Sequence, residues 1–235
     1  MINEKAYALG SKSSVIREIF EYGKKRKSEI GEEKVFDFSL GNPSVPAPGV
    51  VTDTLNKIIN NTDPTKLHGY TSAPGDIGVR KAIADYLNKT HGAHENAKNI
   101  FLTAGAAASL TISLNAIVNS GDEMIVLAPF FPEYKVFIEK AGGVLHVVKC
   151  REPDFQPDLC ELEKSINEKT KALIINSPNN PTGAVIPEET IEKIAEILEK
   201  KQKEYSTQIF IISDEPYREL VYSDKKAYYC TKHAK

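Results

Sequence analysis

The stretch Lys171-Ala-Leu-Ile-Ile-Asn-Ser-Pro-Asn-Asn-Pro-Thr-Gly183 decides the fold class of this chain. Residues 171–175 form a short, mainly apolar run, which is typical of a strand buried on both faces. The polar residues 176–183 contain proline and glycine, and their composition predicts a turn. A helical pattern follows at about 187–203. This part of the chain therefore indicates a strand, a loop and a helix in succession.

The same succession recurs along the chain on both sides of that stretch. Further apolar runs lie at 99–103, 123–127, 144–148 and 208–213, with helical patterns between most of them at about 105–119, 132–141 and 158–166. Strands that alternate with helices predict βαβ units. The expected fold is therefore α/β, with a mostly parallel sheet and helices on both faces.

The first part of the chain has a different pattern, because it combines predicted helices with one short alternating run at 35–40, and regular alternation begins only at residue 99. The helices are expected near 13–27, 48–60 and 76–90, with a loop over 61–75. The proline-rich stretch Gly41-Asn-Pro-Ser-Val-Pro-Ala-Pro48 separates the first of these helices from the rest. Such a stretch marks a boundary between structural parts.

Composition and charge argue against several classes of protein. The 235 residues are 41% hydrophobic and 26% charged, with a formal net charge of -2, which are ordinary values for a globular protein. Charges of both signs are mixed along the chain, so neither a nucleic-acid surface nor a membrane surface is expected. No apolar stretch has transmembrane length, and residues 1–10 lack the core of a signal peptide.

The cysteines and histidines show no spacing typical of metal ligands. Cys150, Cys160 and Cys230 are odd in number, and His91 and His94 lie in a polar stretch that fits a surface loop better than a metal site. No metal site is therefore expected. A reducing cytoplasm is the location that fits the free thiols best.

Residues with binding chemistry follow the predicted strands at their carboxyl ends, which is the edge where open α/β sheets bind ligands. The segments concerned are 104–109, 128–134, 176–183 and 214–217. Together they offer small backbone donors, an aromatic pair, amides, and a carboxylate beside a phenol. This combination suits a planar, phosphorylated, heteroaromatic ligand.

The first two segments have the chemistry to bind a phosphate and a ring. Gly105, Ala106 and Ala107 have small side chains at a helix start, and their N–H groups could hold a phosphate against the helix dipole. An ordinary turn of small residues is the alternative. Phe130 or Phe131 could stack on a ring face, although an aromatic residue after a strand ordinarily packs in the core.

The last two segments have the chemistry to bind the polar atoms of such a ring. Asn180 could donate to a phenolate oxygen, and Tyr217 could reach the same oxygen. Asp214 ends an almost wholly apolar strand, where a buried carboxylate needs a partner. A protonated pyridine nitrogen would be such a partner, since an aspartate keeps that proton in place and helps the ring accept electrons. A cap on the following segment is the alternative role of Asp214.

Five motifs in sequence order resemble those of the class I/II aminotransferases, which are fold-type I pyridoxal-phosphate-dependent enzymes. The resemblance runs from about residue 35 to residue 224. Its two best signatures are Ser177-Pro-Asn-Asn-Pro-Thr-Gly183 and Ser213-Asp-Glu-Pro-Tyr217. The other three are Ser39-Leu-Gly-Asn-Pro43, the stretch from Gly69-Tyr70 to Ala82-Ile83, and Gly121-Asp-Glu followed by an apolar run and Pro129.

The resemblance implies roles for the residues that would surround the ring of pyridoxal 5'-phosphate. Asp214 would pair with the pyridine nitrogen. Asn180 and Tyr217 would hydrogen-bond the phenolic oxygen, and Phe131 would stack on the ring.

It also implies roles at the phosphate and at the substrate. Gly105, Ala106 and Ala107 would bind the phosphate, although Ala107 departs from family members that have a hydroxyl there. Tyr70 would reach the phosphate in the neighbouring subunit of a homodimer, and Gly41 would lie beside the substrate carboxylate. In the same comparison, residues 1–47 correspond to an N-terminal arm and a segment of the small domain. Residues 48–235 correspond to an incomplete large, cofactor-binding domain.

One essential residue of the family has no match in this chain. The Schiff-base lysine of the family lies in a Ser-x-Ser-Lys setting on the next strand, and its spacing places it beyond Lys235. Lys225, Lys226, Lys232 and Lys235 lack that setting. The resemblance therefore implies that no catalytic residue is present and that the terminus is truncated or altered.

The activity that the resemblance implies is transfer of an amino group from an amino acid to a 2-oxo acid, in amino acid metabolism. The 235-residue chain itself is expected to be inactive. A carbon–sulfur lyase on the same scaffold shares every motif and is a second interpretation. A degenerate, non-catalytic fragment that retains weak cofactor binding is a third. The sequence does not indicate which amino acid is the substrate.

Overall fold

A computed structural model describes residues 2, 4–11, 15–41, 45–222, 224 and 226–230 of the chain. The chain divides into two compact units, Met1–Tyr70 and Thr71–Lys235, and each is described by itself. The domain boundary expected at residues 47 and 48 remains a prediction, because it concerns the domains of a whole family member.

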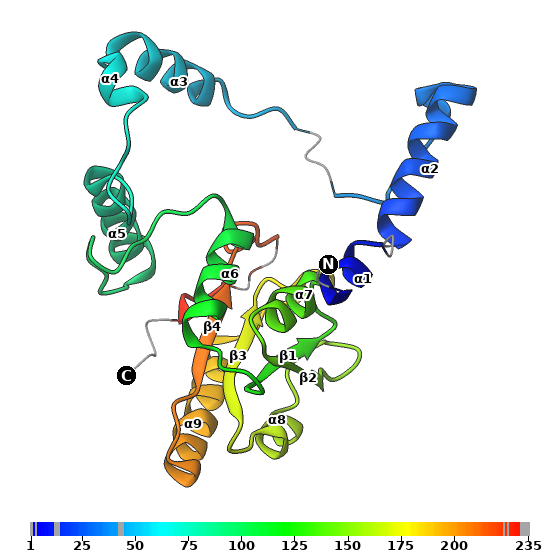
Figure 1. Ribbon diagram of the computed structural model, residues 1–235, viewed down its shortest axis with the longest axis vertical. Coiled ribbons are helices and arrows are strands. Elements are labelled where there is room, and N and C mark those ends of the chain that lie inside the picture. Colours follow the sequence, from blue (N-terminus) through cyan, green and yellow to red (C-terminus); the bar gives the residue numbers. More distant parts are fainter. Residues whose placement is uncertain are drawn as a thin grey trace. The chain divides into compact units, whose positions relative to one another are not determined.

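The first unit is helical (Figure 1). It contains α1 (Glu4–Ser11), α2 (Val15–Ile30), the short 3-10 helix η1 (Glu32–Lys34), α3 (Gly49–Asn61) and α4 (Pro64–Leu67). The sequence predicted α2 and α3 to within a few residues, but it predicted a loop where α4 lies. That short helix forms because the Asp63 side chain accepts hydrogen bonds from the N–H groups of Thr65 and Lys66, while Pro64 suits the first turn.

The second unit is built on a sheet of four parallel strands (Figure 1). The strands are β1 (Glu123–Ala128), β2 (Val144–Lys149), β3 (Thr170–Asn176) and β4 (Phe210–Asp214), in the order β2-β1-β3-β4. All three pairings are parallel, as the sequence predicted. Because β3 lies between β1 and β4, the loops that leave these three strands emerge side by side at one edge of the sheet.

Helices cover both faces of this sheet, which confirms the predicted α/β class. The helices of the unit are α5 (Ile77–His91), α6 (Ala106–Ile117), α7 (Glu133–Lys140), α8 (Leu159–Ser165) and α9 (Glu188–Tyr205). Successive side chains of a strand point to opposite faces. In β1, Ile125 and Leu127 pack in the core formed with α8 and α9. Met124 and Val126 pack in the core formed with α6 and α7.

The predicted strand at 99–103 is wrong, because these residues form no strand in the structure. Phe101 is 68% exposed, and the Leu102 N–H donates to the Pro74 carbonyl instead of to a ladder. An apolar run becomes a strand only when a neighbouring strand pairs with its backbone groups. None of the described strands lies beside residues 99–103, and β4 likewise has β3 as its one described neighbour.

The helices were also compared with the requirements of a membrane span. In the part of the chain that the structure describes, every helix is too short or too polar to cross a bilayer.

The two-sided core predicts a large effect for truncation of Leu173 in the middle of β3. This side chain is fully buried, so Leu173→Ala leaves a cavity and is expected to lower the free energy of unfolding by about 2–5 kcal/mol. Urea unfolding of the 235-residue chain measures the change. Leu55→Ala, at an exposed position of α3, is the matched control and should change it by less than about 0.5 kcal/mol. Equal losses in the two variants would contradict this description of the core.

Candidate functional site

A pocket of about 220 Å³ lies where the loops after β1, β3 and β4 meet the first turn of α6. Six of the predicted cofactor-binding residues line it, namely Ala106, Ala107, Phe131, Asn180, Asp214 and Tyr217. Leu110, Tyr134, Phe137, Asn176 and Pro216 complete the lining. The structure thus brings together residues that are more than one hundred positions apart in the sequence.

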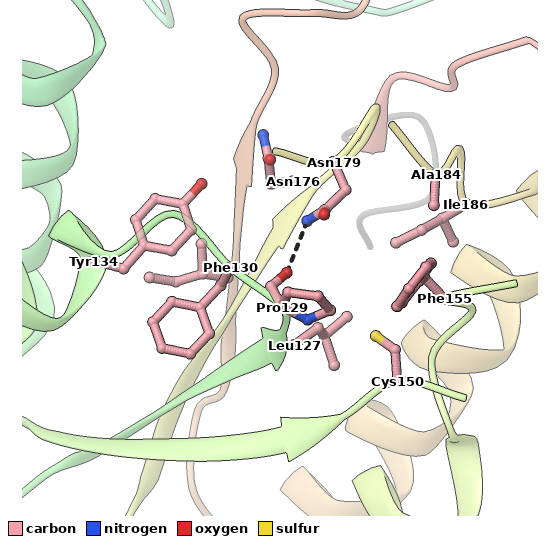
Figure 2. A pocket seen from close by; sticks show the side chains of 11 residues that line it. Leu127, Pro129, Phe130, Tyr134, Cys150, Phe155, Asn176, Asn179, Ala184 and Ile186 are labelled. Atoms are coloured by element: carbon pink, nitrogen blue, oxygen red, sulfur yellow. Dashed lines mark hydrogen bonds between the residues drawn. The ribbon is translucent and has the colours of Figure 1, made fainter. Parts of the chain in front are cut away.

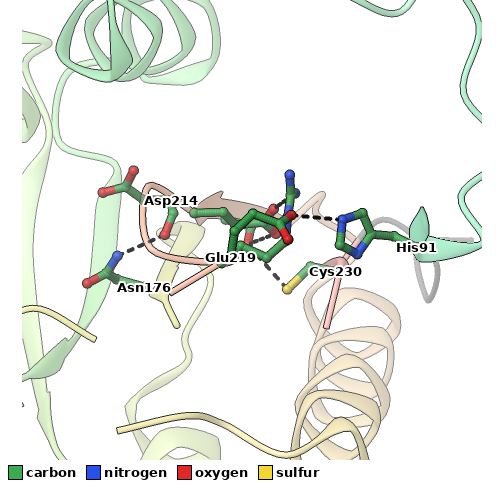
Figure 3. Close-up of polar contacts among 8 residues, drawn as sticks. His91, Asn176, Asp214, Glu219 and Cys230 are labelled. Carbon is green, nitrogen blue, oxygen red and sulfur yellow. Dashed lines mark hydrogen bonds and ion pairs between the residues drawn. The ribbon is translucent and has the colours of Figure 1, made fainter. Parts of the chain in front are cut away.

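Asp214 is the last residue of β4 and faces this pocket. Its carboxylate oxygen Oδ2 accepts a hydrogen bond of 2.5 Å from the Tyr134 hydroxyl on α7. Its backbone carbonyl accepts a bond of 2.8 Å from the side-chain amide of Asn176 (Figure 3). Hydrogen bonds from α7 and β3 therefore fix both the side chain and the backbone of Asp214.

Tyr134 is a site residue that the sequence analysis missed. It is only 2% exposed and packs stacked against Phe130 and edge-on against Phe131; Figure 2 shows Tyr134 beside Phe130. Burial first, and the hydrogen bond to Asp214 second, raise the pKa of Tyr134 far above its ordinary value of 10.0. The phenol therefore keeps its proton and acts as a donor. Nothing in the sequence distinguished it from an ordinary core aromatic residue.

Asn176 organises the loop that follows β3. Its side-chain oxygen accepts from the Asn180 N–H at 2.7 Å, while its side-chain nitrogen donates to the Asp214 carbonyl. A second amide fixes the same loop, because Asn179 donates to the Pro129 carbonyl at 3.3 Å (Figure 2). The loop of residues 176–183 is thus tied to both neighbouring strand ends. The sequence placed Asn176 at this edge of the sheet but gave it no role.

Asn180 and Tyr217 lie together on the pocket wall. The Asn180 side-chain nitrogen is 3.5 Å from the Tyr217 hydroxyl, at the outer limit of a hydrogen bond. These are the two residues predicted to bind one phenolic oxygen, and the structure brings their polar atoms close enough to share a ligand atom.

The start of α6 forms another part of the wall. Gly105 precedes the helix with a φ of +86° and provides no side-chain cap, a conformation that glycine adopts without strain. Ala106 and Ala107 in the first turn line the pocket, although Gly105 itself does not. The first N–H groups of a helix attract anions, because they lack partners within the helix.

The other predicted residues lie elsewhere. Tyr70 and Gly41 belong to the first unit, and their predicted roles remain predictions. Lys225, Lys232 and Lys235 lie outside the described residues, and Lys226 lines a separate surface pocket. Among the described residues no group of three histidine, cysteine or acidic side chains is arranged to hold a metal ion.

The donor set of the pocket fits pyridoxal 5'-phosphate. The Asp214 carboxylate suits a protonated ring nitrogen, and the Asn180 amide and Tyr217 phenol suit a ring oxygen. Phe131 offers an aromatic surface, and the turn at Ala106 offers N–H groups for a phosphate.

Known proteins resemble this chain over most of its length. The family model described as aminotransferase class I and II matches residues 33–233. The aspartate aminotransferase of Pyrococcus horikoshii is 33% identical over 224 residues, which are 95% of this chain and 53% of that protein. The probable aspartate/prephenate aminotransferase of Aquifex aeolicus is 36% identical over 82% of this chain and 46% of its own length. The chain therefore spans about half the length of the curated relatives that it matches.

Solved structures show the same similarity. The crystal structure of an amino transferase from Eubacterium rectale matches with a TM-score of 0.95 and 53% identity, over 99% of this chain and 59% of that one. Aspartate aminotransferase from Thermus thermophilus with maleate matches with a TM-score of 0.84 and 25% identity, over 100% of this chain and 58% of that one.

The bond between Tyr134 and Asp214 predicts a pH-dependent stability difference. Tyr134→Phe removes a hydrogen bond to a charged group and should lower the free energy of unfolding at pH 7 by about 1.5–3 kcal/mol. Because the pKa of Tyr134 is raised on folding, the unfolded chain ionises first as the pH rises. The difference in the free energy of unfolding between wild type and Tyr134→Phe should therefore have its full size at pH 7 and up to about pH 10. Above about pH 10 this difference should become smaller.

Urea unfolding at several pH values measures this difference. Tyr222→Phe, at an exposed tyrosine, is the control and should leave the stability unchanged. If the Tyr134→Phe difference were absent at pH 7, the tyrosine would not be bonded to Asp214 as described.

Proposed function

The chain belongs to the class I and II aminotransferases, and we propose that the pocket at the ends of β1, β3 and β4 seats pyridoxal 5'-phosphate for amino-group transfer from an amino acid to a 2-oxo acid. The match of the family model to residues 33–233 supports this proposal. Members of this family depend on pyridoxal 5'-phosphate. Six residues with suitable chemistry line the same pocket, which supports that cofactor as its ligand.

The observation that carries the proposal is the hydrogen bonding of the Asp214 carboxylate. Tyr134 binds its oxygen Oδ2, and none of the described residues hydrogen-bonds its other oxygen, Oδ1. Asp214 is half-buried, so its carboxylate has lost part of its hydration, and a protonated ring nitrogen in the pocket would give its free oxygen a partner. Tyr134 leaves that position open, because it approaches one oxygen only.

The other residues of the pocket would bind the remaining groups of the cofactor. Asn180 and Tyr217 would bind the phenolic oxygen, and Phe131 would lie against the ring. The N–H groups around Gly105, Ala106 and Ala107 would bind the phosphate at the start of α6. When bound, the cofactor supplies an electron-accepting ring. Asp214 contributes by holding the proton on the ring nitrogen.

Catalysis is proposed for a protein of the relatives' full length, since this chain spans about half of them. The lysine that binds the cofactor covalently, the homodimer contact of Tyr70, the placement of Gly41 beside the substrate and the cytoplasmic location belong to the same proposal. The curated relatives named above carry aspartate in their names, so aspartate is the first amino donor to test. No observation on the structure favours a carbon–sulfur lyase.

Removal of the Asp214 carboxylate should weaken cofactor binding. Asp214→Ala is expected to reduce the affinity of the 235-residue chain for pyridoxal 5'-phosphate about tenfold or more, because a charged hydrogen bond is lost. An absorbance titration measures the dissociation constant. Asp85→Ala, at an exposed aspartate of α5, is the matched control. Equal affinities in the wild type and Asp214→Ala would refute the proposed seating of the ring.

Covalent attachment gives an independent prediction for the same chain. Its lysines lack the Ser-x-Ser-Lys setting of the family, so the cofactor is expected to bind without specific attachment. Borohydride reduction followed by peptide mapping should find no lysine labelled near one equivalent. Stoichiometric labelling of a single residue, with Lys232 the first to check, would show instead that this chain contains its own covalent site.

A further inference from the structure

The turn that follows β4 determines where Tyr217 lies. Residues Glu215-Pro216-Tyr217-Arg218 form a turn in which the Arg218 N–H donates to the Glu215 carbonyl at 3.3 Å. Proline is favoured at the second position of such a turn, and Tyr217 occupies the third. The backbone position from which the phenol extends therefore depends on how firmly the two ends of the turn are held.

The phenol itself is held weakly. Its contact with Asn180 is 3.5 Å long, and Tyr217 is 36% exposed. A side chain with such loose restraint needs support from its backbone if it is to present its hydroxyl to one ligand atom.

An ion pair clamps the two ends of the turn together. The guanidinium of Arg218 donates through Nη1 to Glu215 Oε2, and the two side chains are only 16% and 12% exposed. The other oxygen of Glu215 accepts from the Ser213 hydroxyl at 2.7 Å. The clamp is therefore anchored in β4 on the strand side of Asp214.

The same guanidinium connects the turn to α5. Arg218 Nε donates to Glu219 Oε1 at 3.3 Å, and His91 Nε2 lies 3.1 Å from that oxygen (Figure 3). His91 is the last residue of α5 and packs near the rings of Tyr86 and Tyr229. The Arg218 guanidinium in turn lies over the Tyr229 ring, 5.2 Å from its centre. One cation thus joins the turn, α5 and the segment at 226–230.

Among the described ion pairs with the same spacing, this is the one in which both side chains are largely buried. Arg151 and Asp154 are also three residues apart, but their side chains are 58% and 52% exposed and 3.5 Å apart. Exposed pairs contribute little, because solvent screens them. Removing one partner of a largely buried pair leaves the other charge unsatisfied. Glu215 and Glu219 would both lose their shared donor if Arg218 were replaced.

From this geometry we propose that Arg218 is a positioning residue of the cofactor site, which fixes Tyr217 by binding Glu215 and Glu219 at once. The positioning of Tyr217 by Arg218 is independent of the proposed function. Its consequence, a firm contact between the Tyr217 hydroxyl and the cofactor, rests on that function. Arg218 itself does not line the pocket, so it is not placed to touch a cofactor bound there.

Fluorine NMR of the 235-residue chain tests the positioning without any cofactor. The chain is labelled with 3-fluorotyrosine, and the resonance of Tyr217 is identified as the one that Tyr217→Phe removes. We expect one narrow resonance in the wild type and in the Arg151→Met control. Arg218→Met should broaden, split or shift that resonance, and Arg218→Lys should have a smaller effect, because lysine keeps the charge but not the planar fork. An unchanged resonance in Arg218→Met would overturn the proposal.

A double-mutant cycle tests the consequence for pyridoxal 5'-phosphate. Arg218→Met should weaken binding about tenfold when Tyr217 is present, and by less than about twofold in a Tyr217→Phe background. A purely structural role of Arg218 would instead give equal losses in both backgrounds, and this result would overturn the proposal. If urea unfolding shows that Arg218→Met does not fold, Arg218→Lys is used in the same cycle; a smaller loss is expected, and equal losses in the two backgrounds would again overturn the proposal. Failure of the wild type to bind the cofactor would refute the proposed function, while the fluorine resonance would still decide the role of Arg218.

Discussion

The parallel pairing of β3 with β1 on one side and β4 on the other is the constraint on which the pocket depends. In this register Asn176 and Asp214 are paired residues at the ends of neighbouring strands. The amide of Asn176 can therefore bond both to the Asp214 carbonyl and to the loop that carries Asn180. Three segments that are distant in sequence meet because their strands end together, and the side chains beyond those ends form one wall.

The Asp214 carboxylate is half-buried and has lost part of its hydration, which hydrogen-bond donors around it can offset. One oxygen of the carboxylate has a hydrogen-bond partner among the described residues, and the other has none. Tyr134, buried on α7, satisfies one oxygen with a proton that it retains, since burial and the bond to Asp214 raise its pKa. Asp214 also lines the pocket, together with an aromatic ring, an amide, a phenol and a helix start. Asp214 thereby connects the packed core, through Tyr134, with the lining of the pocket.

The sequence predicted the parts of this arrangement that depend on local pattern. The apolar runs gave β1 to β4, and the residues after them gave Asp214, Asn180 and Phe131 at the pocket. Structural features that depend on contacts with other residues were harder to predict from local sequence pattern. Residues 99–103 have the pattern of a strand, but no described strand pairs with them. Tyr134 has the pattern of a core aromatic residue, and only its distance to Asp214 shows its second role. The short helix α4 depends on one cap at Asp63 and lies in a stretch whose composition is that of a loop.

The central claim is that Asp214 receives a protonated ring nitrogen of pyridoxal 5'-phosphate, and nitrogen NMR tests it most directly. The 235-residue chain is mixed with cofactor labelled with nitrogen-15 in the ring, and the ring-nitrogen resonance of the bound form is measured across neutral pH. The account predicts the chemical shift of a protonated pyridine that persists above the pH at which the free cofactor loses this proton, and its loss in Asp214→Ala. A bound cofactor whose ring nitrogen titrates as it does in free solution would contradict the account.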